Sequence, residues 1–216
     1  TIAAGHSIGA LDFSMRELGK ADQQLLARLE RAIGASGFLR LILANGTLFE
    51  LFRILQHATS GFRTALLGQL TPAQAAALVD KTIASGRSIG TLNFAMMELG
   101  ETDPDLLVHL EHAIGAPSFV RLILANGTLF ELFRILQDAT SGFRSALLDQ
   151  VTSAQAAALL DKTVAAARNI ESFHFTLRRL ANDRGQLTRL EGLLGVEGWW
   201  RLLIACGSLN SIGQIA

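Results

Sequence analysis

The sequence predicts an all-α protein with the architecture of a right-handed α-solenoid, a superhelix in which short helical repeats stack on one another. Three observations predict this fold class. A long segment returns unchanged about 81 residues further along the chain. Apolar residues recur at helical spacing along most of the chain. Residues typical of helix starts and helix ends divide the chain into short segments.

The repetition is clearest at residues 40–56, which are identical to residues 121–137. A third and less similar copy begins near Arg168 and retains Gly207-Ser208-Leu209. Equal units of this kind bury their apolar faces against their neighbours, so we expect one continuous array. The copies are expected at about residues 5–85, 86–166 and 167–216, the last of them incomplete. Because both ends align with the interior of a copy, we expect the chain to be a fragment of a longer protein.

Apolar spacing predicts the helices themselves. One helix face collects Leu129, Leu132, Phe133 and Leu136 at positions i, i+3, i+4 and i+7. Other apolar residues extend this surface beyond a single stripe, so we expect the helix to be covered on most sides. No part of the sequence alternates polar and apolar residues in the way of a half-buried strand.

The boundaries between helices recur from copy to copy. Gly34 and Gly115 mark one boundary. At Gly127-Thr128, the glycine is expected to end one helix and the threonine to cap the next. In Thr71-Pro72-Ala73-Gln74 the threonine is the N-cap, proline takes the first helical position and glutamine completes a capping box. These boundaries predict about five helices per copy, each of roughly 9 to 15 residues.

Each copy is itself divisible into two repeats of about 40 residues. Gly90-Thr91-Leu92 and Gly127-Thr128-Leu129 open two segments with a similar apolar rhythm. In this period and helix layout, the chain resembles the HEAT/armadillo class of α-solenoids over its whole length. The resemblance implies a curved superhelix whose concave face is lined by one helix of every repeat.

Composition limits the classes of partner. The 216 residues are 50% hydrophobic and carry no formal net charge. A neutral balance argues against nucleic acid or an anionic membrane as the dominant partner, because either favours a basic excess. No apolar run reaches the roughly 20 residues of a spanning helix, so no transmembrane segment is expected. The single Cys206 excludes an internal disulfide, which is compatible with a reducing compartment such as the cytoplasm or a host cytosol.

The internal copies test for catalytic and metal-binding residues, because a catalytic group is needed once whereas a structural residue recurs. His109 and His112 lie three residues apart on one predicted helix, a spacing that could hold a metal. The first copy has Arg28 and Arg31 at these positions, so we interpret them as part of a solvated face. Phosphate-binding loops and nucleophile motifs are missing from the sequence. We expect no metal, no cofactor and no enzymatic activity.

Trp199 and Trp200 stand where the second copy has Phe119 and Val120. Because both tryptophans keep the apolar rhythm, packing in the core is favoured over a stacking platform for a ligand. Cys206 also lies in an apolar stretch and is interpreted as a buried structural thiol.

Arrays of this kind usually bind other molecules, so the expected function is a scaffold that binds a protein or peptide along its concave face. Charges that recur between copies either tie neighbouring repeats together or contact this partner. Glu131 and Arg134 are the only charged residues on the apolar helix at residues 129–136. Their equivalents in the first copy are Glu50 and Arg53, which lie three residues apart and can form an ion pair on one helix. The candidate binding residues are Glu50, Arg53, Glu131, Arg134, Arg40 and Arg121.

A second hypothesis is a helical repeat protein that binds nucleic acid through a repeated arginine ladder. It requires Arg40, Arg53, Arg63 and their equivalents to face one side, with binding that weakens steeply with salt. Leu70-Thr71-Pro72-Ala73-Gln74, followed by an alanine-rich helix, is similar to the opening of the DNA-reading repeats of TAL effectors. Those repeats are shorter than the copies here, and their base-reading loop has no clear counterpart in this chain.

Overall fold

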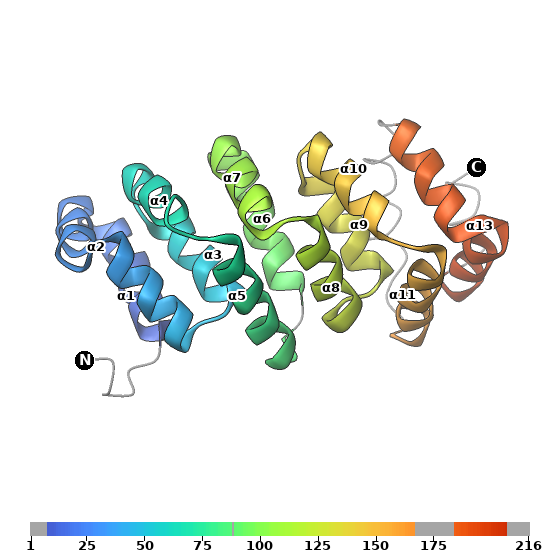
Figure 1. Cartoon of the computed structure of the whole chain (residues 1–216), viewed down its shortest axis with the longest axis horizontal. Coiled ribbons are helices and arrows are strands. Elements are labelled where there is room, and N and C mark those ends of the chain that lie inside the picture. Colours follow the sequence, from blue (N-terminus) through green and yellow to red (C-terminus); the bar gives the residue numbers. More distant parts are fainter. Residues whose placement is uncertain (1–7, 88, 167–183, 207–216) are drawn as a thin grey trace. The chain divides into compact units, whose positions relative to one another are not determined.

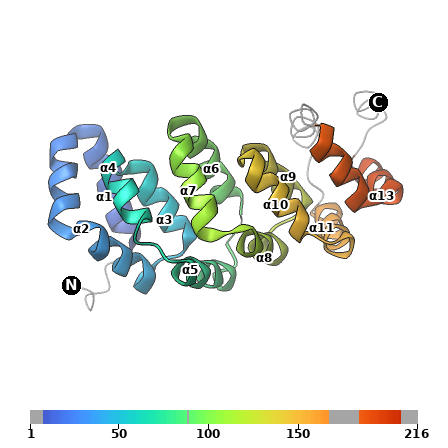
Figure 2. The ribbon, with the colours of Figure 1, turned by 45° about the horizontal axis from the view of Figure 1, so that its top comes forward.

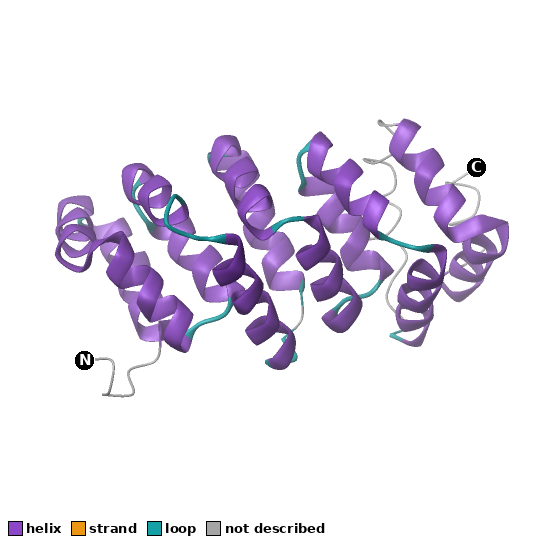
Figure 3. Ribbon diagram, viewed as in Figure 1, coloured by secondary structure: helices purple, strands orange, loops and turns teal. Residues whose placement is uncertain are grey.

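A computed structural model describes residues 8–87, 89–166 and 184–206, and all regular structure in these ranges is helical (Figure 3). This confirms the predicted all-α class. The helices are α1 (Ile8–Ala21), α2 (Gln23–Asn45), α3 (Leu48–His57), α4 (Ser60–Leu67), α5 (Pro72–Ala84), α6 (Gly90–Thr102), α7 (Pro104–Ile114), α8 (Ala116–Asn126), α9 (Leu129–Asp138), α10 (Ser141–Gln150), α11 (Ser153–Ala165) and α13 (Arg184–Cys206). Much of the expected third copy and the side chain of Cys206 lie outside the described residues.

The chain forms two compact units, Thr1–Ser118 and Phe119–Ala216. In the first unit, α1, α3 and α6 pack in one row, and α2, α4 and α7 pack in a second (Figure 1 and Figure 2). Helix α5 packs against α2, α3 and α7. In the second unit, α11 packs against α9 and α13, and α13 also contacts α10.

Helix starts follow the predicted capping chemistry. The backbone N–H of Thr71 donates to the Gln74 side chain at 2.9 Å, and the Gln74 N–H donates back to the Thr71 hydroxyl at 3.3 Å. The predicted capping box at α5 is therefore confirmed. Thr128 is confirmed as the N-cap of α9, and its N–H donates to Glu131 at 3.0 Å. Such contacts satisfy backbone donors that a helix start leaves without partners.

Three glycines at equivalent positions bend the chain sharply. Gly34 (φ 70°) lies inside α2, Gly115 (φ 76°) separates α7 from α8, and Gly195 (φ 63°) lies inside α13. Residues with a Cβ rarely adopt this backbone conformation, so glycine is required here. Because Gly115 separates two helices, the described part of the second copy contains six helices, α6 to α11, one more than expected. At the end of α2, in contrast, Gly46 has an ordinary φ of −113°.

A buried threonine links the third helix to the fifth in the first copy. The Thr82 hydroxyl accepts a hydrogen bond from the Leu48 N–H at 3.0 Å and donates to the Leu78 carbonyl at 2.6 Å. The second copy has the same arrangement, with Thr163 accepting from Leu129 at 2.9 Å. The copies therefore repeat buried polar contacts as well as apolar positions, and each contact holds a helix start in place.

Lysines on the same two helices make a second repeated contact. Lys81 on α5 donates to the Ala44 carbonyl at 3.1 Å, and Lys162 on α11 donates to the Leu124 carbonyl at 2.6 Å. Each lysine thus donates a hydrogen bond to a carbonyl near the C-terminal end of an earlier helix. Among the helices described, no single one is long and apolar enough to cross a membrane, and one bent pair meets that length and composition only when its two helices are combined.

Candidate functional site

A pocket of about 260 Å³ opens on the first unit, where the consecutive helices α1, α3 and α6 pack in a row. It is lined by Arg16 from α1, by Phe49, Phe52, Arg53, Gln56 and His57 from α3, and by Thr91, Phe94, Ala95 and Glu98 from α6. Its volume is below the roughly 300–1,000 Å³ of small-molecule and cofactor sites.

Exposed phenylalanines mark this row of helices. Phe13 on α1 is 55% exposed, and Phe94, which lines the pocket on α6, is 50% exposed. The two residues occupy equivalent positions in the first and second copies. Large apolar side chains at the surface are candidates for contact with another molecule.

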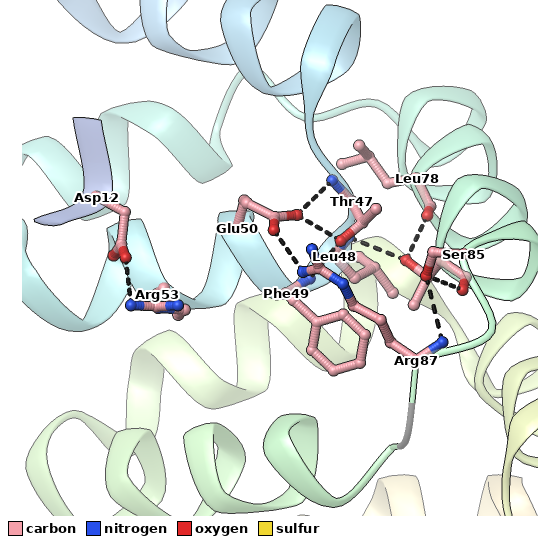
Figure 4. Close-up of polar contacts among 10 residues, drawn as sticks. Asp12, Thr47, Leu48, Phe49, Glu50, Arg53, Leu78, Ser85 and Arg87 are labelled. Atoms are coloured by element: carbon pink, nitrogen blue, oxygen red, sulfur yellow. Dashed lines mark hydrogen bonds and ion pairs between the residues drawn. The ribbon is translucent and has the colours of Figure 1, made fainter. Parts of the chain in front are cut away.

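The wall of the pocket includes a charged pair with one end inside the protein. The Asp12 carboxylate on α1 is 1% exposed, and its Oδ2 lies 2.6 Å from Nη2 of Arg53, whose side chain is 45% exposed (Figure 4). Among the described residues, neither oxygen of Asp12 accepts an aligned hydrogen bond, so the ionic attraction to Arg53 compensates its burial. This contact also fixes the position of the guanidinium group at the pocket.

A second buried carboxylate holds another exposed arginine over Phe49, which lines the pocket. Glu50 accepts hydrogen bonds from the Thr47 backbone at 2.8 Å and from Nη1 of Arg87 at 2.7 Å (Figure 4). Burial tends to raise the pKa of Glu50, but the contacts with Thr47 and Arg87 outweigh it, so the pKa lies below the usual value. The Arg87 side chain is 58% exposed and lies over the Phe49 ring, 6.0 Å from its centroid.

The remaining polar groups of the pocket come from α3 and α6. Gln56 donates a hydrogen bond to the carboxylate of Glu98. Burial lowers the pKa of His57, and the positive charges of Arg16 and Arg53 lower it further, while Asp12 acts in the opposite direction. His57 is therefore uncharged at neutral pH.

The structure distributes the predicted binding residues over different environments. The carboxylates of Glu50 and Glu131 are buried and accept from the backbone at the starts of their helices. Glu50 and Arg53 do not pair on their own helix as expected, because Glu50 contacts Arg87 and Arg53 contacts Asp12. Of the predicted binding residues, only Arg53 lines the pocket.

The other predicted arginines lie elsewhere. Arg134 on α9 packs over the Phe130 ring at 5.8 Å, while Arg40 on α2 and Arg121 on α8 are exposed. Two arginines assigned to the ladder turn toward the backbone. Arg63 donates to the carbonyls of Ala58 (2.8 Å) and Gln56 (3.0 Å). Arg144 makes the equivalent contacts with Ala139 and Gln137.

Several other sequence interpretations have a structural outcome. Trp199 stacks on Phe133 at a centroid distance of 6.4 Å, as core packing predicts, but Trp200 is 54% exposed, so the core prediction is wrong for it. His109 and His112 are both exposed. In the described ranges, no three His, Cys, Asp or Glu side chains gather as metal ligands would.

The sequence did not single out Arg16 and Phe94, which line the pocket, or Asp12 and Phe13, which contact Arg53 and Arg16 of its lining. A signal for the phenylalanines was present, because Phe13, Phe94 and Phe175 recur at equivalent positions. What the sequence did not reveal is their exposure. The contact between Asp12 and Arg53 joins two different helices, so the spacing of residues within one helix does not predict it.

The fold and the pocket together define an all-helical protein with a polar-rimmed apolar pocket on one row of its helices. Comparison of the chain with protein-family models, with curated proteins and with solved structures found no match.

Proposed function

We propose that this chain is a non-catalytic interaction scaffold, an α-solenoid of the HEAT/armadillo type, which binds a peptide segment of a partner protein across α1, α3 and α6. The observation that carries the proposal is the recurrence of half-exposed phenylalanines, Phe13 and Phe94, on two helices of this row. A segment lying along the row contacts one phenylalanine after the other, with the pocket between helices receiving one of its side chains.

Rigid positioning supports this function. Helix α3, which supplies half of the pocket lining, is held at its start by the capping box of Thr47 and Glu50 and by the buried hydroxyl of Thr82. A surface ordered before the partner arrives loses little conformational entropy on binding. The charged side chains also suit binding better than proton transfer, because Asp12 and Glu50 are each paired with an arginine.

The inward arginines favour a peptide over nucleic acid. An arginine ladder needs guanidinium groups that reach phosphates along one face. Arg63 and Arg144 instead donate their hydrogen bonds to backbone carbonyls. Fewer cations are thus left for a continuous polyanion than the sequence suggests.

The test is an affinity capture from cell lysate at low and at high salt, with bound protein and bound nucleic acid both identified. The variant is Phe13→Ala combined with Phe94→Ala, and the matched control is Val108→Ala, which removes a side chain of similar exposure from α7. We expect a protein captured at high salt whose affinity for the double variant is lower by about tenfold or more. Equal capture by the double variant and the control contradicts the proposal, as does capture of nucleic acid alone.

A further inference from the structure

We propose that the partner segment carries a carboxylate side chain, from Asp or Glu, beside the apolar residue that contacts Phe94. The proposal rests on the proposed function and adds to it the chemistry of the segment. It follows from two ion pairs near the pocket, in which the carboxylate is buried and the guanidinium group faces solvent.

Two ion pairs at this surface have their negative ends inside and their positive ends outside. Asp12 is 1% exposed while the Arg53 side chain is 45% exposed. For Glu50 and Arg87 the side-chain values are 12% and 58%. Each pair is neutral in sum, but the solvent-facing end is a guanidinium group in both. A ligand at the surface therefore meets positive charge first, and the positive ends attract an anionic group.

A third guanidinium group reaches the pocket from the neighbouring helix. Arg16 lines the pocket from α1, with its side chain 37% exposed and its guanidinium group 5.1 Å from the ring centroid of Phe13. Its ion-pair partner Glu17 is exposed to solvent, so this pair is weak and open to exchange. Arg16 and Arg53 thus bring two cationic groups from two helices to one small pocket. Arginine forks match the planar geometry of a carboxylate.

The surrounding acidic groups limit the charge that the pocket accepts. Glu98 lines the same pocket and accepts from Gln56, and Asp12 and Glu50 lie just inside the surface. A single carboxylate meets the guanidinium groups of Arg16 and Arg53 at this pocket, whereas a run of phosphates also meets these three acids. The surface therefore favours one anionic side chain over a polyanion.

The apolar part of the pocket determines what accompanies the carboxylate. Phe52 is 1% exposed and Phe49 is 3% exposed, so they form a covered wall, while Phe94 stands half exposed at the rim. An apolar side chain against these rings gains stabilisation from burial, and the adjacent carboxylate remains within reach of the arginines. An acidic residue next to a large apolar residue fulfils both requirements.

Arg16→Met is the sharpest test, because the chain itself has Met97 at the equivalent position of the second copy. The matched control is Arg28→His on α2, which also removes one positive charge and introduces the residue found at the equivalent His109. Arg28 does not line the pocket. When the new histidine is uncharged, both variants lower the net charge by one. A difference in peptide affinity between them therefore does not arise from long-range electrostatic attraction.

The probe is a displayed library of random dodecapeptides, selected on the whole chain. Selected peptides are synthesised with each Asp or Glu intact and replaced by Asn or Gln, and their binding is measured by fluorescence anisotropy. We expect Asp or Glu to be enriched beside a large apolar residue. Arg16→Met should weaken binding about tenfold or more, with little effect from Arg28→His. Neutral peptides should bind weakly and respond little to Arg16→Met.

A double variant that removes both charges of an ion pair distinguishes lost binding from lost folding. Replacing Arg53 alone leaves Asp12 buried without its partner, so Arg53→Met is combined with Asp12→Asn, which introduces the residue found at Asn93. This pair of changes should also weaken acidic peptides by about tenfold while leaving the far-ultraviolet circular dichroism unchanged.

The outcomes separate the two proposals. Selected peptides that require Phe94 but contain no enriched acid overturn the carboxylate proposal and leave the scaffold function standing. A single-stranded oligonucleotide that displaces acidic peptides at equal concentration also overturns it, in favour of phosphate recognition. If no peptide is selected whose binding depends on Phe13 or Phe94, the proposed function fails and the carboxylate proposal fails with it.

Discussion

The carboxylate of Asp12 and the guanidinium group of Arg53 form an ion pair of 2.6 Å whose two ends lie in different surroundings. The carboxylate is buried on α1 and the guanidinium group is half exposed on α3 at the edge of a pocket. A buried carboxylate is costly unless a partner compensates it. The pair therefore connects the stability of the first unit to the placement of a side chain at its candidate binding surface.

Replacing Arg53 should destabilise the protein by more than an exposed arginine normally does. Breaking a fully buried ion pair costs about 3–5 kcal/mol, and the half-exposed position of Arg53 lowers the expectation for Arg53→Ala to about 1–3 kcal/mol. Asp12→Asn combined with Arg53→Met should restore much of this loss, because no charge is left buried. Urea denaturation of the two variants measures the difference, and equal destabilisation would show that Asp12 gains little from Arg53.

The buried hydroxyl of Thr82 should be important for the start of α3. Thr82→Val preserves the shape but leaves the Leu48 N–H without its acceptor, which costs about 1–3 kcal/mol. Thr102→Val is the control, since that exposed hydroxyl bonds only the Glu98 carbonyl of its own helix. Thermal unfolding followed by circular dichroism should show a clear drop for Thr82→Val and little change for Thr102→Val. Equal melting temperatures would refute the role of the hydroxyl.

Gly34 should not tolerate a side chain, even though space is present. Its backbone adopts φ 70° and ψ 157°, and a Cβ placed there meets no atom within 4 Å. The expected cost of Gly34→Ala is about 1–3 kcal/mol, and it arises from the backbone alone. Gly61→Ala is the matched control, because it lies in α4 in equally open space at an ordinary φ. Gly61→Ala should stabilise the protein by about 0.5–1 kcal/mol. Chemical denaturation measures whether the free energy of unfolding falls for Gly34→Ala and rises for Gly61→Ala.

His57 should make the stability of the protein fall as the solution becomes acidic. Its pKa in the folded protein lies below the usual 6.5 because of burial and the nearby arginines. The unfolded chain therefore binds a proton first, and stability is lost as pH falls below about 6.5. We expect the melting temperature of the His57→Gln variant to change less with pH in this range than that of the unchanged protein.

The measurement is a series of melting curves from about pH 7.5 to about pH 5.5. His109→Gln is the control, since that side chain is exposed. An unchanged pH profile for His57→Gln would contradict the burial of His57. At lower pH, below the usual 4.5 of a glutamate, protonation of Glu50 should remove a further contribution, because its folded pKa is also depressed.

The local elements were readable from the sequence because their signals are local. Thr71-Pro72 with Gln74 predicts the start of α5, and Gly115 predicts a helix boundary, as the structure confirms. Gly34, predicted as the equivalent boundary, is a sharp bend within α2. The periodic leucines and phenylalanines of α9 predict a helix with most of its surface covered. Capping and helical periodicity act within a few residues, so a single sequence contains them completely.

The interactions of the charged residues could not be predicted in the same way. Glu50 and Arg53 are three residues apart and suggest a pair on one helix, but each contacts a residue from a different part of the chain. Likewise, the exposure of Trp200 depends on what packs against α13, and spacing within α13 does not contain that information.

By itself, the sequence determined the helical class, the positions of several helix ends and the internal repetition of the chain, since these follow from local backbone preferences and from direct comparison of its copies. Only the tertiary structure decided that Asp12 is buried against Arg53, that Phe94 stands exposed at a pocket and that Arg63 turns toward carbonyls. The physical reason is that burial and charge pairing depend on helices brought together from distant parts of the chain.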